Sequence, residues 1–128
     1  MKVGSDLDGV IAYTPLKKND YVPFKLREFY NSCSPTKYAK MNFDYIITGR
    51  KEFFRKLTKK WLEKYDVNYG NLVMYPNKIR KSLNGVFKFK TKVINELGIK
   101  KYYENHRGIY NHLRENCTYA YIIFIEKI

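Results

Sequence analysis

At 128 residues the chain has the length of one domain, which excludes most multidomain architectures. Hydrophobic residues make up 45% of the chain and aromatic residues 17%, enough apolar surface to form a core and to argue against intrinsic disorder. The 25 basic against 12 acidic residues give a formal net charge of +13, which favours a polyanionic partner such as nucleic acid or another phosphorylated molecule. A lysine-rich, solubilising surface would produce the same excess.

Cysteine spacing and hydropathy exclude several other classes. Cys33 and Cys117 lie far apart without CxxC or Cys/His spacing, so we expect neither a disulfide framework nor a zinc site. No stretch approaches the roughly 20 apolar residues of a membrane span, and residues 1–5 run directly into charged sequence without the pattern of a signal peptide. The expectation is a cytoplasmic protein without membrane association.

Hydrophobic periodicity predicts strands that alternate with helices within one domain, residues 1–128. The expected strands are residues 2–6, 43–47, 72–75, 101–103 and 119–125, and the expected helices are residues 24–31, 51–64, 90–97 and 107–115. Gly98 suits a helix C-terminus. The alternation predicts an α/β fold, a three-layer α/β/α sandwich around a mostly parallel, Rossmann-like sheet. In such sheets ligands bind beyond the carboxyl ends of the strands.

Two carboxylates follow the first predicted strand. Asp6 and Asp8 are separated by one residue, and Gly9 lets the chain turn sharply after them. Carboxylates at this spacing could hold a divalent cation against a phosphate, or one could attack phosphorus while the other moves a proton. Acidic residues before a glycine are also common turn formers, so the pair alone does not establish catalysis.

Three later segments add polar groups near the same sheet edge. The second strand is expected to stop at Thr48-Gly49-Arg50, where a hydroxyl and backbone N–H groups could receive a phosphoryl oxygen, although Thr48 would also suit a helix N-cap. Lys90 lies in an alternation of lysine and apolar residues that can turn an ammonium inward, whereas solvated lysines are the usual case. Glu104 would add a third carboxylate, unless it is an exposed residue at a helix entry.

Together and in this order, these segments resemble the motifs of the haloacid dehalogenase-like (HAD) superfamily. The resemblance extends from residue 2 to about residue 115, and the closest matches are Asp6-Leu7-Asp8-Gly9-Val10 and Ile46-Ile47-Thr48-Gly49-Arg50. The chain is most similar to small nucleotidase-like and polynucleotide-phosphatase-like members. These share a threonine and a Trp-Leu pair in the helix after the TGR segment, here Thr58 and Trp61-Leu62.

The resemblance implies a phosphatase that works through an aspartyl-phosphate. Asp6 would be the nucleophile, and Asp8 would protonate the leaving group and then activate water. Thr48 would hold a phosphoryl oxygen, and Lys90 would pair with Asp6 and the phosphate. The residues expected to contact substrate are Gly49, Arg50 and Arg107.

The resemblance also implies a Mg²⁺ cofactor. Asp6, the backbone carbonyl of Asp8 and Glu104 would bind it, with Asn105 beside them. The superfamily usually places an aspartate where this chain has Asn105, and the loss of one carboxylate could weaken metal binding. Asparagine can still ligate magnesium through its carbonyl oxygen or through a bound water.

The spacing of the motifs leaves no room for a large cap domain, although residues 12–40 could form a small lid. An open site is typical of superfamily members that act on macromolecular phosphates. Six basic residues and one acid lie in residues 50–60, and six basic residues and no acid lie in residues 67–95, so an extended anion could bind there. Tyr75, Phe87 and Phe89 could stack on bases, but aromatic residues of this kind more often belong to the core.

These observations predict a Mg²⁺-dependent phosphomonoesterase acting on a nucleotide or a nucleic-acid terminal phosphate. The alternative is a catalytically impaired protein of the same fold that binds nucleic acid or another polyanion. A phosphotransferase or a regulatory subunit is a third possibility, and the oligomeric state stays open.

Overall fold

The computed structural model describes residues 1–14 and 23–126, which form a main sheet with helices on both faces and a second, two-stranded sheet. Within these ranges the sheet has five strands in the order β5-β4-β1-β6-β7, and all four neighbouring pairs are parallel. The elements in chain order are β1 (Val3–Ser5), β2 (Ala12–Tyr13), α1 (Pro23–Ser32), β3 (Ser34–Pro35), the 3-10 helix η2 (Lys37–Lys40), β4 (Asn42–Lys51), the 3-10 helix η3 (Glu52–Phe54), α2 (Arg55–Lys64), β5 (Asn68–Tyr75), α3 (Leu83–Leu97), β6 (Lys101–Glu104), α4 (Arg107–Asn116) and β7 (Tyr121–Phe124).

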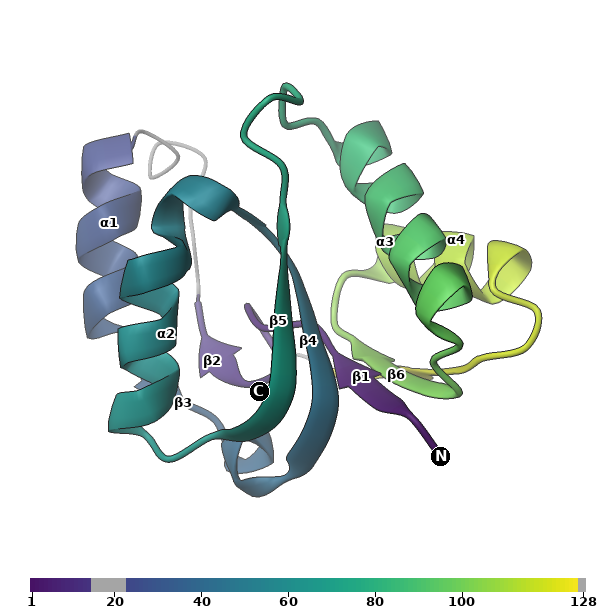
Figure 1. Cartoon of the computed structure of the whole chain (residues 1–128), viewed down its shortest axis with the longest axis horizontal. Helices are drawn as coiled ribbons and strands as arrows, with labels where there is room; N and C mark the ends of the chain where they lie inside the picture. Colours follow the sequence, from purple (N-terminus) through teal and green to yellow (C-terminus); the bar gives the residue numbers. More distant parts are fainter. Residues whose placement is uncertain (15–22, 127–128) are drawn as a thin grey trace.

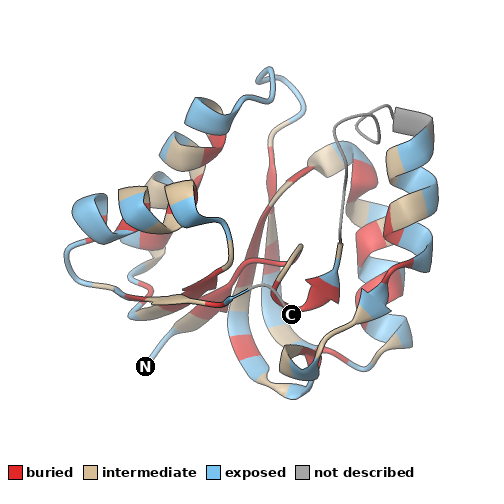
Figure 2. Cartoon of the chain, turned by 180° about the vertical axis from the view of Figure 1, so that it is seen from behind, coloured by how far each residue is buried: buried red, intermediate tan, exposed pale blue. Residues whose placement is uncertain are grey.

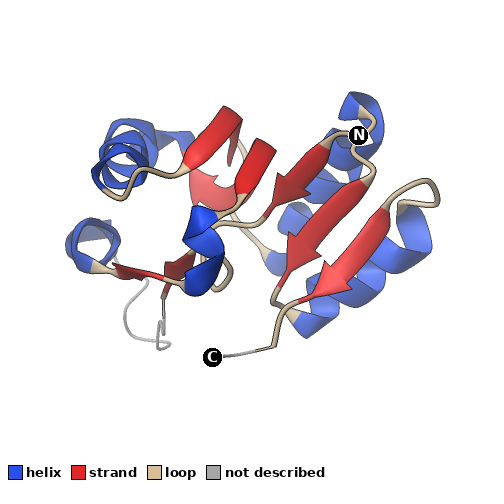
Figure 3. Ribbon diagram, turned by 90° about the horizontal axis from the view of Figure 1, so that it is seen from below, coloured by secondary structure: helices blue, strands red, loops and turns tan. Residues whose placement is uncertain are grey.

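The helices form two outer layers. α1 and α2 cover one face of the sheet, and α3 and α4 cover the other (Figures 1 and 3). This arrangement confirms the predicted α/β/α sandwich. None of the helices in the described ranges is long and apolar enough to cross a membrane.

Side chains of the central strands alternate between two hydrophobic clusters. Ile46 packs in the cluster beneath α1 and α2, whereas its neighbour Ile47 packs in the cluster beneath α3 and α4. Tyr103 and Tyr102 divide in the same way. Both faces of a parallel sheet are therefore buried, which is why these strands read as continuous apolar runs and why Figure 2 shows the buried residues along the sheet.

Several element boundaries differ from the sequence-based expectation, and two of them concern elements that carry predicted site residues. β4 does not stop at Thr48 but continues through Gly49 and Arg50 to Lys51, with an irregular register opposite β5 between Thr48 and Lys51. α3 begins at Leu83 and not at Lys90, because the Ser82 hydroxyl caps it by accepting a hydrogen bond from Gly85 N. Its predicted end is confirmed, since Gly98 follows in the left-handed conformation with φ 66°.

The described residues show no separate cap domain. Between β1 and β4 they contribute α1, which packs on α2, and the short antiparallel pair β2 and β3. The small lid expected at residues 12–40 stays a prediction, and residues 15–22 lie outside the described ranges.

The strand order places a topological switch at β1. β4 and β5 lie on one side of β1, and the later strands β6 and β7 lie on its other side. Connections that leave in opposite directions open a crevice at the carboxyl ends of the strands, where ligands bind in sheets of this type. The ends of β1, β4 and β6 meet there.

Candidate active site

An open cavity of about 710 Å³ lies at the carboxyl ends of β1 and β4. It brings together most of the residues singled out in the sequence, although they come from four parts of the chain. The predicted site residues that line it are Asp6, Asp8, Thr48, Gly49, Arg50, Lys90 and Asn105.

Asp6 is held at the end of β1 by the backbone and by a lysine. Its backbone N–H donates to the Tyr103 carbonyl at 2.9 Å, which continues the β1–β6 pairing. Its side-chain Oδ1 accepts a hydrogen bond from Leu7 N at 2.8 Å and lies 3.0 Å from Lys90 Nζ. The carboxylate is therefore fixed in position at the floor of the cavity, where only 7% of the residue is exposed.

Lys90 links Asp6 to Glu104. Its ammonium donates to Glu104 Oε1 at 2.8 Å, and both side chains are buried. The other carboxylate oxygen, Oε2, accepts the backbone N–H groups of Asn105 and His106, each at 3.1 Å. Glu104 thus positions Lys90 and the turn after β6, and within the described residues both of its oxygens already have protein donors.

Burial and neighbouring charges shift the pKa values of Asp6 and Lys90. Desolvation by burial and the charge of Glu104 raise the pKa of Asp6 well above its usual range, while Lys90 lowers it. Desolvation by burial also opposes the charged form of Lys90, but Asp6 and Glu104 outweigh it and raise the pKa of Lys90 well above its usual range. The lysine therefore stays protonated, and a further cation near Asp6 would favour its carboxylate form.

Arg50 forms a second ion pair with Asp8. The guanidinium donates to both carboxylate oxygens, from Nη2 to Oδ1 at 2.6 Å and from Nε to Oδ2 at 2.9 Å. Its Nη1 donates to Thr58 Oγ1 at 3.2 Å, and the guanidinium lies 3.7 Å from the centre of the Tyr30 ring. The residue is 1% exposed, so Arg50, which was expected to contact substrate, is engaged in orienting Asp8.

Thr48 and Gly9 shape the walls of the site. Thr48 is buried, and its Oγ1 accepts the backbone N–H of Arg50 at 3.0 Å, which turns its own hydroxyl proton away from that amide. Gly9 has φ 90°, and a Cβ built there would lie 1.9 Å from Asn105 Nδ2. Only glycine allows this turn to bring the Asp8 backbone against the Asn105 side chain.

Asn105 faces two of the groups expected to bind a metal, Asp6 and the Asp8 carbonyl, but not the third, Glu104. One terminal atom of its side-chain amide lies 3.1 Å from Asp6 Oδ2 and 2.9 Å from the Asp8 carbonyl oxygen. With nitrogen in that position the amide donates two hydrogen bonds, and with oxygen there three oxygen atoms converge.

With the amide oxygen turned toward Asp6, the three oxygens would form a donor set that suits Mg²⁺. This ion commonly binds one or two carboxylates and completes its coordination with water and substrate phosphate. In the described residues no group of three or more His, Cys, Asp or Glu side chains is arranged to hold a metal ion. A carboxylate, a backbone carbonyl and an amide oxygen are therefore what this chain offers.

Arg107 and the predicted stacking aromatics are not brought to the cavity. Arg107 lies outside the cavity lining, and its guanidinium stacks 3.8 Å from the centre of the Phe124 ring. Tyr75 is fully buried, Phe89 packs on it edge to face, and Phe87 stacks on His112. Tyr75 is therefore a core residue and not a stacking residue, whereas Phe87 and Phe89 are partly buried and pack against the α3 side of the core.

Tyr30, Lys81 and His106 are among the lining residues that the sequence analysis did not assign to the site. Tyr30 comes from α1 and contacts Arg50. His106 caps α4, because its Nδ1 accepts the Ile109 N–H at 3.2 Å. Lys81 reaches the cavity from the loop before α3. In the sequence Lys81 is one of six basic residues in the acid-free segment 67–95, and nothing there distinguishes it from the other five.

No family model and no curated protein sequence matches this chain. Two solved structures share its fold: a chain of the Pnkp1/Rnl/Hen1 RNA repair complex, with a TM-score of 0.73 and 18% identity, and a chain of a second Pnkp1/Rnl/Hen1 complex structure, with a TM-score of 0.72 and 17% identity. Both similarities cover 98% of this chain but only 42% and 46% of the other chains, so this chain spans less than half of their length.

Proposed function

We propose that the protein is a Mg²⁺-dependent phosphomonoesterase of the HAD type that acts on a nucleotide or a nucleic-acid terminal phosphate. The observation that carries the proposal is the Asp6–Lys90 ion pair, 3.0 Å between Oδ1 and Nζ, at the floor of an open cavity that Asp8, Thr48 and Asn105 also line. The fold shared with chains of RNA repair complexes supports a nucleic-acid end as the substrate class.

The chemistry follows from the contacts around Asp6 and Asp8. A carboxylate oxygen of Asp6 would attack phosphorus, forming a new O–P bond as the ester O–P bond breaks, and Asp8 would give a proton to the departing ester oxygen. Asp8 would then take a proton from water, the water oxygen would attack phosphorus, and Asp6 would leave as the carboxylate. The net reaction consumes one water and releases an alcohol and inorganic phosphate.

The remaining side chains position these groups and offset charge. Lys90 would neutralise the phosphoryl group beside Asp6, and Thr48 would donate its hydroxyl proton to a phosphoryl oxygen. Arg50 would keep Asp8 oriented, because its bidentate contact occupies one lone pair on each carboxylate oxygen and leaves others for proton transfer. Mg²⁺, held by Asp6, the Asp8 carbonyl and Asn105, would supply further neutralisation of phosphate charge.

Asp6→Asn tests the assignment directly. The wild-type protein with Mg²⁺ should release phosphate from a generic aryl phosphate, chelation should stop it, and the variant should be inactive. Asp66→Asn is the matched control, since Asp66 is exposed at the end of α2 and its left-handed φ of 52° suits asparagine. Turnover by Asp6→Asn would show that Asp6 is not the nucleophile.

A second candidate function is nucleic-acid binding without hydrolysis. It is favoured by the orientation of Asn105 in which the amide donates to both Asp6 and the Asp8 carbonyl, since this closes the metal position with hydrogen bonds. Asn105→Asp separates the two candidates by calorimetric titration with Mg²⁺. Under the first function both proteins bind Mg²⁺ and the variant binds more tightly, whereas under the second only the variant binds.

A further inference from the structure

Near the cavity lie large apolar side chains that are exposed to solvent and do not pack in the core. Phe53 is 61% exposed, Leu83 is 52% exposed and Ile79 is 51% exposed. Leu83 lines the cavity, and Phe53 is the direct neighbour of Phe54, which also lines it. We call Phe53, Ile79, Lys81 and Leu83 the rim. Exposed apolar residues grouped beside a polar cavity point to a ligand that extends out of it.

Phe53 is held in place at this rim. Its backbone N–H donates to Asn77 Oδ1 at 2.9 Å, which ties η3 to the loop after β5. Its ring packs edge to face on Phe54 at 5.2 Å between ring centres, and the Arg27 guanidinium lies 5.3 Å from the ring centre. An aromatic ring that is fixed and largely exposed can stack on a planar ligand with little loss of conformational freedom.

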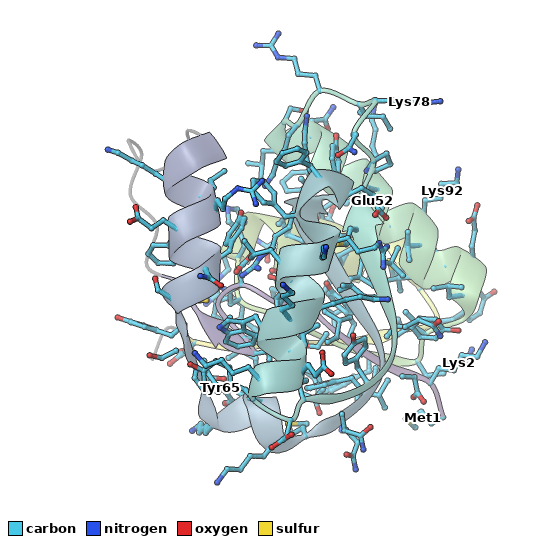
Figure 4. The ribbon with its side chains drawn as sticks, turned by 60° about the vertical axis from the view of Figure 1, so that its left-hand side comes forward. Met1, Lys2, Glu52, Tyr65, Lys78 and Lys92 are labelled. Atoms are coloured by element: carbon cyan, nitrogen blue, oxygen red, sulfur yellow. The ribbon has the colours of Figure 1, made fainter. Side chains whose placement is uncertain are left out.

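The charge around the rim is positive. The loop that carries Ile79 also carries Lys78, Arg80 and Lys81, and residues 67–95 contain no acid. Glu52 is the acid of the neighbouring η3, and Arg55 binds both of its oxygens at 2.6 Å. Lys78 and Glu52 lie at the same end of the molecule, away from Met1 and Lys2 (Figure 4).

Lys81 connects this basic loop to the catalytic groups. It lines the cavity, and its Cε lies 3.7 Å from the position a Cβ on Gly49 would take. Desolvation by burial lowers its pKa, and the charges of Asp8 and Asp6 act in the opposite direction. Lys81 therefore lines the same cavity as Asp6 and Asp8, while the loop leads outward to Arg80 and Lys78.

We propose that the rim binds the end of a single-stranded nucleic acid, with Phe53 stacking on a base and Lys81 pairing with an internucleotide phosphate. The assignment rests on the proposed function, in which the terminal phosphate lies in the cavity. A free mononucleotide has only its terminal phosphate and no internucleotide phosphodiester for the cations of the loop. A single strand offers both exposed bases and a row of phosphates, matching the apolar and cationic groups that alternate here.

Binding of a short fluorescent oligonucleotide that carries no terminal phosphate tests the rim without turnover. Alanine substitution of a stacking aromatic typically costs about 1–3 kcal/mol per base, so Phe53→Ala should weaken binding about 5- to 100-fold. Phe53→Trp should retain it and Phe53→Leu should not. Tyr121→Ala is the matched control, because Tyr121 is 71% exposed but begins β7 at the opposite end of the strands.

Salt dependence tests the role of Lys81. Lys81→Ala should reduce the slope of log affinity against log salt by about 0.7, the value for one phosphate contact on a single strand. Lys60→Ala, on the exposed face of α2, should leave the slope unchanged.

The proposal would be overturned if Phe53→Ala and Tyr121→Ala bound the oligonucleotide equally well. It would also be overturned if Lys81→Ala and Lys60→Ala gave the same slope of log affinity against log salt, or if the protein bound a duplex or a phosphopeptide through the rim more tightly than the single strand. Since the probe has no phosphate to release, these results are independent of catalysis. An inactive wild-type protein that still binds through Phe53 would instead contradict the phosphatase assignment alone.

Discussion

Replacing Arg50 by lysine should destabilise the protein far more than the same change at Arg55. Both arginines make bidentate contacts to a carboxylate, Arg50 to Asp8 at 2.6 and 2.9 Å and Arg55 to Glu52 at 2.6 Å for each bond. The Arg50 side chain is fully buried, whereas the side chains of Arg55 and Glu52 are 35% and 36% exposed. The comparison therefore tests burial together with the additional contacts that Arg50 makes with Tyr30 and Thr58.

The magnitude for Arg50→Lys follows from the contacts that a lysine cannot reproduce. The desolvated cation–π contact with Tyr30 is worth roughly 2 kcal/mol, and the hydrogen bond to Thr58 and the second bond to Asp8 are each worth about 1 kcal/mol. Because the lysine keeps its charge and these terms are not additive, we expect a loss of about 3 kcal/mol. For a domain of this size that corresponds to a fall in Tm of roughly 10 °C.

Arg55→Lys is expected to cost less than about 1 kcal/mol, since exposed ion pairs contribute little. Urea and thermal unfolding, followed by circular dichroism for both variants in one buffer without metal, measure the difference. Equal losses in the two variants would refute the reasoning, because they would show that burial of the Asp8–Arg50 pair adds nothing to its contribution.

Three further predictions concern the same site and its supports. Lys90→Met should destabilise the protein by about 3–5 kcal/mol in urea unfolding, because it leaves Asp6 and Glu104 buried without their cation. The control Lys92→Met changes a side chain that is 73% exposed, and should alter the stability by less than about 0.5 kcal/mol. Gly9→Ala should lower the free energy of unfolding by about 3 kcal/mol or more, because it combines a φ of 90° with a Cβ 1.9 Å from Asn105. Gly98→Ala, with φ 66° and nothing within 4 Å of the new Cβ, should lower it by about 1 kcal/mol in the same assay. Burial raises the pKa of Cys117 from 9.0 to about 11, so the folded state binds the proton more tightly and stability should fall as the pH rises from 9 to 11. Measured by urea unfolding, the free energy of unfolding should fall less steeply over this pH range in Cys117→Ala than in the wild-type protein. Parallel pH profiles of the two proteins would contradict the prediction.

The sequence was sufficient to predict the layers of the fold and the groups at the strand ends. Strand alternation and parallel connection place Asp6, Thr48 and Glu104 at one edge of the sheet wherever the individual strands begin. Lys90 was identified from the register of the resemblance, and helical geometry turns it inward while Lys88 and Lys92 stay exposed. These features depend on local pattern and on strand order, and both can be read from one chain.

Contacts between distant elements could not be read in this way. The role of Arg50 depends on Tyr30 from α1 and Thr58 from α2, which meet it only because these two helices pack together. Arg107 follows Glu104 closely in sequence, yet the turn into α4 directs it onto Phe124 and away from the cavity. Phe53 was read as part of an amphipathic helix, but a 3-10 turn precedes α2 and leaves its ring at the cavity mouth.

An asparagine at position 105, where the family that the sequence resembles usually has an aspartate, changes the charge of the site more than its shape. Asp6, Asp8 and Glu104 contribute three carboxylates, and Lys90, Arg50 and the cavity-lining Lys81 contribute three cations, so an aspartate at position 105 would give the group a negative excess beside the buried Asp6. The amide keeps an oxygen within reach of Asp6 and the Asp8 carbonyl without adding charge, and its nitrogen can bond the same two atoms. The orientation of one amide therefore separates the two candidate functions: with oxygen facing Asp6 the site can take a divalent cation and a phosphate, and with nitrogen there it is closed by hydrogen bonds.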